Sequence, residues 1–259
     1  MLKIITTLSL FLIGMLAKGQ EAENRELSSF SKVEVKNGIE VIYTESKMPF
    51  LRVEAENVSV LKNLITEVKG KTLKIYLLKK EDQTALENTI KVYLSAQNVS
   101  SFDVHSNSKI SVMNQITSEN LNIDLKSKGQ LSGTIICNGK TKLVANSGTI
   151  FNGRVETISF VGNFKNNSKI NVSGTTDKAS IEASDSSLLE ARNFIANTIL
   201  LNARGKSKAM IHVTKTIAVT VADEARISYT EYPEKINLND EAESFQKNNT
   251  NKQLVSINY

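Results

Sequence analysis

The chain has 259 residues, a formal net charge of +5 and a single cysteine, Cys137. The mild charge is not gathered into one basic run, so nothing indicates nucleic acid as a partner, and one cysteine excludes an intramolecular disulfide or a cysteine-based metal site. Two prolines, no tryptophan and many Val, Ile, Thr, Ser and Asn residues favour strands joined by polar turns.

The first 19 residues have the pattern of a secretory signal peptide. Lys3 precedes an uncharged run of 13 residues, and Ala17 and Gly19 are the small residues that a signal peptidase recognises. A membrane anchor is the alternative, but the run is shorter than the roughly 20 apolar residues that span a bilayer, and no later run is long enough. We expect cleavage after Gly19 and a linker over residues 20–29. The mature protein is expected to have no transmembrane segment and to be periplasmic, outer-membrane-associated or extracellular.

Residues 30–95 are expected to form a less regular β region that acts as a cap or as first irregular coils. Alternating strands are predicted at residues 32–36, 39–43, 51–55, 73–77 and 90–94, with one short helix near residues 58–65. Asn37-Gly38 between the first two strands predicts a hairpin. A solenoid needs such a cap because its open end exposes core and strand edges.

A repeat of about 20 residues follows over residues 96–232. Each repeat centres on a small residue, the anchor, that lies 18 to 21 residues from the next; the anchors are Ser108, Gly129, Gly148, Ser168, Ser187, Ser207 and Ala225. Two positions after each anchor stand Ile110, Leu131, Ile150, Ile170, Leu189, Ala209 and Ile227. Four positions before each anchor stand Val104, Leu125, Val144, Phe164, Ala183, Ala203 and Val221. Both columns are wholly apolar, and mostly polar columns alternate with them.

This alternation indicates two strands meeting at a small-residue corner, not a helix. The period predicts an all-β, single-stranded, right-handed parallel β-helix whose rungs stack ~4.8 Å apart. The third rung is the weakest, because Lys142 lies in an otherwise apolar column; a slip of one residue, with Leu143 and Ala145 inward, would repair it. Residues 233–259 are expected to be a polar tail or a C-terminal cap, with a possible strand over residues 254–259.

Short motifs in a fixed order give the chain a resemblance to a known family. They are the opening Phe30-x-x-Val33-x-Val35-x-Asn37-Gly38-Ile39-Glu40-Val41, the strand Arg52–Glu56, the segment Gly70-x-x-Leu73-x-Ile75 and the Ser/Gly-cornered rungs. Over roughly residues 28–232 the chain resembles the auto-transporter adhesins with a head GIN domain, which are common in Bacteroidetes. The resemblance implies a β-helical fold, and the adhesin label describes the family's architecture.

Two sets of outward residues are candidates for function. Asp103 and Asp124 share a column on neighbouring rungs, ~5 Å apart by the rung spacing, as in a retaining glycosidase pair; a solvated polar column is the alternative. The second set is a basic column, interrupted by uncharged residues, that could attract acidic glycans or lipopolysaccharide. The alternative is an ordinary solvated face. The basic members of the column are Lys109, Lys169, Lys208 and Arg226. His105 and His212 lie on distant rungs, and no motif for a cofactor or metal is present.

Together these features predict an exported, non-catalytic, adhesin-like module that presents a β-helical surface to a cell-surface glycan or an envelope protein. The first alternative is a polysaccharide lyase or hydrolase that uses Asp103 and Asp124. A periplasmic component of envelope-stress sensing is a further alternative.

Overall fold

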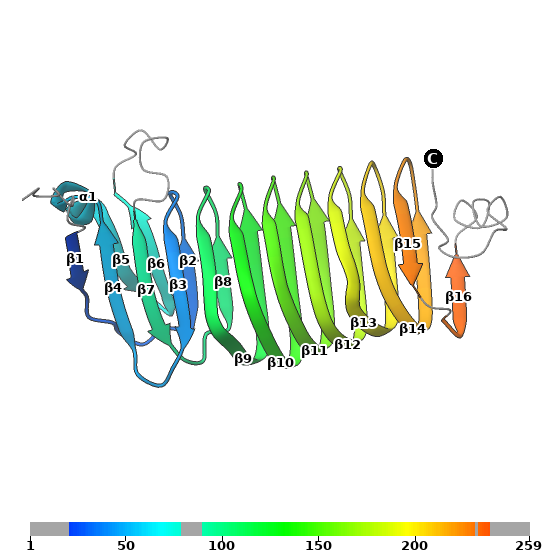
Figure 1. The fold of residues 1–259 in the computed structure, drawn as a ribbon, viewed down its shortest axis with the longest axis horizontal. Coiled ribbons are helices and arrows are strands. Elements are labelled where there is room, and N and C mark those ends of the chain that lie inside the picture. Colours follow the sequence, from blue (N-terminus) through cyan, green and yellow to red (C-terminus); the bar gives the residue numbers. More distant parts are fainter. Residues whose placement is uncertain (1–20, 79–89, 231–232, 239–259) are drawn as a thin grey trace, which may run out of the picture.

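The protein is a rod of stacked β-coils (Figure 1). The structure is a computed structural model that describes residues 21–78, 90–230 and 233–238. Successive long strands pair in parallel, each with the next along the chain. The predicted architecture, an all-β single-stranded parallel β-helix with coils of about 20 residues, is confirmed.

The regular part of the rod begins at β8 (Ser101–Val104) and ends at β15 and β16. Its long strands are β9 (Lys109–Lys126), β10 (Gln130–Asn146), β11 (Ile150–Lys165), β12 (Lys169–Ala183), β13 (Leu188–Ala203) and β14 (Lys208–Val221). β15 (Arg226–Thr230) and β16 (Lys235–Leu238) both pair with β14 and form the last described coil. Because every coil repeats the same path, residues of one sequence column lie side by side along the axis.

Tight turns join the long strands along one edge of the rod, which we name the corner edge. At most of these turns two consecutive residues have positive φ, as Asn166 (51°) and Asn167 (62°) do, and this is the type I′ geometry that Asn, Asp and Gly tolerate best. Backbone hydrogen bonds also join successive turns from Ser106 to Asp185; the Asn167 amide, for example, donates to the carbonyl of Asp185 at 3.0 Å. Six of the seven anchors face inward at this edge; Ser168 and Ser207, for example, are fully buried.

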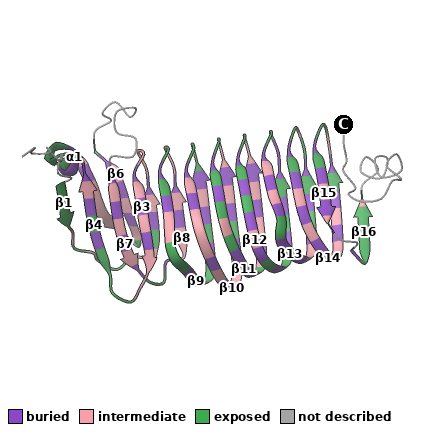
Figure 2. Cartoon of the chain, viewed as in Figure 1, coloured by how far each residue is buried: buried purple, intermediate pink, exposed green. Residues whose placement is uncertain are grey.

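Buried and exposed residues alternate along the strands (Figure 2). The predicted inward columns are correct except in the third rung, where Gly148 is wrong as the anchor. The buried residue there is Thr149, and the inward neighbours are Ala145 and Phe151, whereas Ile150 is 39% exposed. The one-residue slip is thus confirmed, because the alternative would bury the charged Lys142.

The predicted hairpin at Asn37-Gly38 is wrong. Both residues have positive φ as expected, but β2 (Lys32–Val35) pairs with β6 and β8, and β3 (Glu40–Glu45) pairs with β7 and β9. The turn is another corner, and the amide of Gly38 donates to the carbonyl of Ser106 on the next corner. A type I′ turn sets the local direction of the chain, but the inter-coil pairing decides which strands become neighbours.

The coil that stacks on the N-terminal side of β2 and β3 is formed by strands that follow them in the sequence. β6 (Thr72–Leu77) lies against β2 and β7 (Lys91–Ala96) against β3. Antiparallel strands then cover this end: β5 (Leu64–Lys69), β4 (Phe50–Ala55) and β1 (Glu21–Asn24), with α1 (Val58–Asn63) beside them. Arg25 donates to the carbonyls of Leu61 and Leu64 at 3.1 and 2.7 Å, which satisfies backbone groups where the helix ends.

The expected signal peptide over residues 1–19 and the possible strand over residues 254–259 lie outside the described residues. Within the described ranges, no helix combines the length and the apolar character needed to cross a bilayer.

Candidate binding site

Asp103 on β8 and Asp124 on β9 are directly paired in neighbouring coils, and Glu34 on β2 is the next member of the column. One carboxylate oxygen of each aspartate, Oδ1, is buried and has no hydrogen-bond partner. Lys126 forms an ion pair with Asp124. The structure therefore brings the two predicted carboxylates together, but it buries part of each against the sheet.

The carboxyls of this column have contrasting environments. Burial raises the pKa of Asp103; the charge of Lys126 opposes this, and that of Asp124 adds to it. Burial would also raise the pKa of Glu34, but hydrogen bonds and the charges of Lys36 and Lys74 lower it to about 2. The two lysine amines lie 2.9 and 3.1 Å from the Glu34 carboxylate. The ion pair between Lys74 and Glu34 links β6 to β2, whereas the pair between Lys126 and Asp124 lies within β9.

Glu34 gives the N-terminal coils a predicted dependence on pH. Its pKa is about 2 in the fold against an ordinary value of 4.5, so the stability it contributes is complete above about pH 4.5 and is lost as the pH falls towards 2. Glu34→Gln should be less stable than wild type at pH 7, and the difference should shrink at pH 3 in urea unfolding. Asp103→Asn should have the opposite effect and raise the free energy of unfolding at pH 7. The raised pKa of Asp103 means that its charged form is disfavoured in the fold, and asparagine removes that charge. A constant difference between wild type and Glu34→Gln from pH 7 to pH 3 would contradict this role.

Three of the four predicted basic residues lie close together. Lys169, Lys208 and Arg226 begin β12, β14 and β15, and Leu188 of β13 stands between the two lysines. Lys109 is in the same column but three coils away from Lys169. Its ammonium lies 3.5 Å from the Glu40 carboxylate, so Lys109 does not share the environment of the others.

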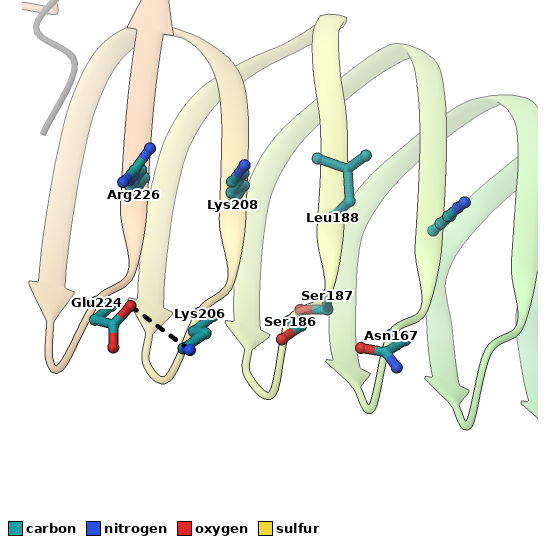
Figure 3. A pocket seen from close by; sticks show the side chains of 9 residues that line it. Asn167, Ser186, Ser187, Leu188, Lys206, Lys208, Glu224 and Arg226 are labelled. Atoms are coloured by element: carbon teal, nitrogen blue, oxygen red, sulfur yellow. Dashed lines mark ion pairs between the residues drawn. The ribbon is translucent and has the colours of Figure 1, made fainter. Parts of the chain in front are cut away.

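These three residues line a hollow of about 530 Å³ on one side of the corner edge (Figure 3), which we name hollow 1. The side chain of Leu188 forms an apolar floor between the two flanking lysines. One wall of the hollow consists of turn residues from the same coils, which are Asn167, Ser186, Lys206 and Glu224. The Lys206 ammonium lies 3.9 Å from the Glu224 carboxylate. Four cations and one carboxylate line the hollow, so it favours an anionic ligand with an apolar face.

A second hollow of about 270 Å³ lies on the other side of the same corners, and we name it hollow 2. Lys165 and Arg204 flank Ser184, and Glu182 and Asn202 lie in the neighbouring column. Neither Lys165 nor Arg204 of hollow 2 is among the site residues predicted from the sequence. The available signal was a basic residue on both sides of one turn, four positions apart, at 165 and 169 and again at 204 and 208.

The remaining reactive side chains do not form a site. His105 lies 3.6 Å from Glu34, and Nδ1 of His212 lies 3.1 Å from the carbonyl oxygen of Arg192, several coils away. Cys137 is buried, and its thiol donates to the carbonyl of Glu119. In the described ranges no cluster of three or more His, Cys, Asp or Glu side chains could hold a metal ion.

Solved structures from Bacteroidetes share this architecture. A putative adhesin from Parabacteroides merdae aligns with a TM-score of 0.70 and 12% identity over 85% of this chain and 95% of its own. A putative lipid binding protein from Parabacteroides distasonis aligns with a TM-score of 0.67 and 18% identity, over 85% of this chain and 96% of its own. A putative adhesin from Bacteroides fragilis aligns with a TM-score of 0.58 and 16% identity, over 86% of this chain and 93% of its own. At such identities the likeness shows the fold alone.

The amino-acid sequence also identifies the family of the chain. The search of curated proteins found no match to the chain. The family model described as putative auto-transporter adhesin, head GIN domain, matches residues 29–233, which include β2 to β15. The chain therefore belongs to the head GIN domain family of putative auto-transporter adhesins.

Proposed function

We propose that this protein is an exported, non-catalytic, adhesin-like module that holds an acidic glycan of a cell surface along the corner edge of its rod. The observation that carries the proposal is hollow 1, where Lys169 and Lys208 flank Leu188 and Arg226 follows Lys208 in the same column. Sugar rings have apolar faces that can cover a leucine, and carboxylate or sulfate groups complement the flanking cations.

The repeat itself favours an extended polymer. Cations two coils apart, such as Lys169 and Lys208, are separated by roughly 10 Å along the axis, so successive anionic groups of one chain can reach both. The adhesin names of the structural neighbours support a binding role, and the putative lipid binding name of another makes a lipid-linked anion the competing ligand. An envelope protein with an acidic surface is the alternative partner.

The alternative of a polysaccharide lyase or hydrolase has less support. Asp103 and Asp124 are paired as such an enzyme would require, but both Oδ1 atoms are buried and neither residue lines hollow 1 or hollow 2. A role in envelope-stress sensing rests only on the expected location.

Charge reversal in hollow 1 tests the proposal. The double variant Lys169→Glu/Lys208→Glu should bind immobilised polygalacturonate at least about tenfold more weakly than wild type, because two attractive contacts become repulsive. Wild-type binding should weaken with added salt, which screens exposed charges, and neutral dextran should not bind.

The matched control is Lys140→Glu/Lys178→Glu, which changes the net charge equally at two exposed residues outside both hollows. Its affinity should stay close to that of wild type. Equal loss in both double variants would mean that only net charge matters, and a wild-type protein that binds no acidic glycan would overturn the proposed function.

A further inference from the structure

The two hollows are built by the same four corners. Lys165 and Lys169 lie before and after the turn Asn166–Asn167, and Arg204 and Lys208 lie before and after the next turn but one. Hollow 1 contains residues in and after each turn, and hollow 2 contains residues before it, with no residue in common. Two coils therefore present a cation on each side of the corner edge.

The coil between them is recessed on both sides. It presents Ser184 before its turn and Leu188 after it, both shorter than the basic residues at the same positions of the coils on either side. Each recess thus has one cation on each side along the axis, roughly 10 Å apart by the coil spacing. The same local sequence pattern makes two hollows of similar design.

These four cations have no partner of their own within the described part of the chain. Lys165, Lys169, Arg204 and Lys208 take part in no side-chain hydrogen bond or ion pair there. Other basic residues near the strand ends are neutralised, for example Lys109 by Glu40 and Lys126 by Asp124. Exposed cations held near one another without counter-charges repel, and a bound anion would relieve this repulsion.

The tip of the recessed corner separates the two hollows. Asp185 occupies the tip, is exposed, and accepts a hydrogen bond from the Ser184 hydroxyl at 2.8 Å. An acidic chain that crossed from one hollow to the other would pass this carboxylate and be repelled. The hollows are therefore suited to two separate chains that run along the two sides of the corner edge.

We propose that hollow 2 is a second acidic-glycan site, so that one protein molecule binds two acidic chains and cross-links them. This inference rests on the proposed function of hollow 1. Hollow 2 should be the weaker site, because its two cations share it with the Glu182 carboxylate, whereas hollow 1 has four cations and one carboxylate. The guanidinium of Arg204 can bind one carboxylate with two parallel hydrogen bonds.

Stoichiometry distinguishes one site from two. Isothermal titration of the full chain with a short oligogalacturonide should give two sites on wild type and one on Lys169→Glu/Lys208→Glu. It should also give one on Lys165→Glu/Arg204→Glu, with the tighter site retained, and two on the control Lys140→Glu/Lys178→Glu. Long polygalacturonate mixed with wild type should increase light scattering through cross-linking, and either hollow variant should abolish that increase. Thermal melting confirms that each variant is folded.

Three outcomes would overturn the second site. A single site on wild type that Lys165→Glu/Arg204→Glu leaves unchanged would reject hollow 2 while keeping hollow 1. Loss of all binding in both hollow variants would indicate one chain that spans the corner. Two sites that persist in Lys165→Glu/Arg204→Glu would place the second chain elsewhere. Absence of any binding to wild type would instead reject the proposed function.

Discussion

Replacing Ile170 with aspartate is expected to abolish the cooperative fold. Ile170 on β12 is 1% exposed and lies between Phe151 of β11 and Leu189 of β13. A carboxylate placed there would lose its hydration without gaining a partner, which costs several kcal/mol, against a total stability of about 5–15 kcal/mol for a typical domain. Circular dichroism of the purified Ile170→Asp variant should show no cooperative thermal transition.

The matched control for this substitution is Ile150→Asp. The apolar pattern alone places Ile150 in the same inward column, but in the structure it points outward and is 39% exposed. The variant should fold, and its free energy of unfolding should change by about 0.5 kcal/mol or less, as for most surface substitutions. If Ile170→Asp melted like wild type, or if Ile150→Asp failed to fold, the assignment of inward and outward faces would be wrong.

Gly174→Ala is expected to have the next largest effect. Gly174 on β12 has a φ of +110°, and a Cβ there would lie 2.1 Å from the carbonyl oxygen of Val155, its partner on β11. The neighbouring atom belongs to the backbone, so the two coils would have to separate. Backbone strain and overpacking together should cost about 2–5 kcal/mol, measured as a lower urea midpoint with an unchanged m-value.

Gly38→Ala separates the contribution of backbone strain from that of overpacking. Gly38 has a φ of +74°, and no atom lies within 4 Å of a Cβ built on it. This variant would carry only the strain of a left-handed residue, about 1–2 kcal/mol. Equal losses in the two glycine variants would show that the close approach of the β11 and β12 backbones does not contribute.

The regular coils were predictable because burial follows chain position with a period of two. Phe164 and Ala183, for example, were assigned to the inward column from alternation alone, and both are buried. The third rung was ambiguous because Val144 and Ile150 are apolar but face outward. Their outward positions follow from the neighbours, since Val144 pairs with Asp124 and Asn163, and Ile150 with Lys169.

The N-terminal region was less predictable for a different reason. The Asn37-Gly38 turn was identified correctly from local chemistry, but its two strands pair with β6, β7, β8 and β9. Chain order and stacking order differ here, because β6 and β7 are placed outside β2 and β3. Local propensity contains no information about such pairings between distant segments.

The sequence by itself determined the coil, its corners and the columns that bring Lys169 and Lys208 near each other, because a strict repeat converts sequence spacing into spatial register. Only the tertiary structure showed that Lys109 is paired with Glu40, 69 residues away, whereas Lys169 is not. It also showed that Ser184 and Leu188 leave a hollow on each side of one corner. A hollow depends on the relative lengths of side chains in adjacent coils and on both faces of a turn, and those neighbours are assembled only when the coils stack.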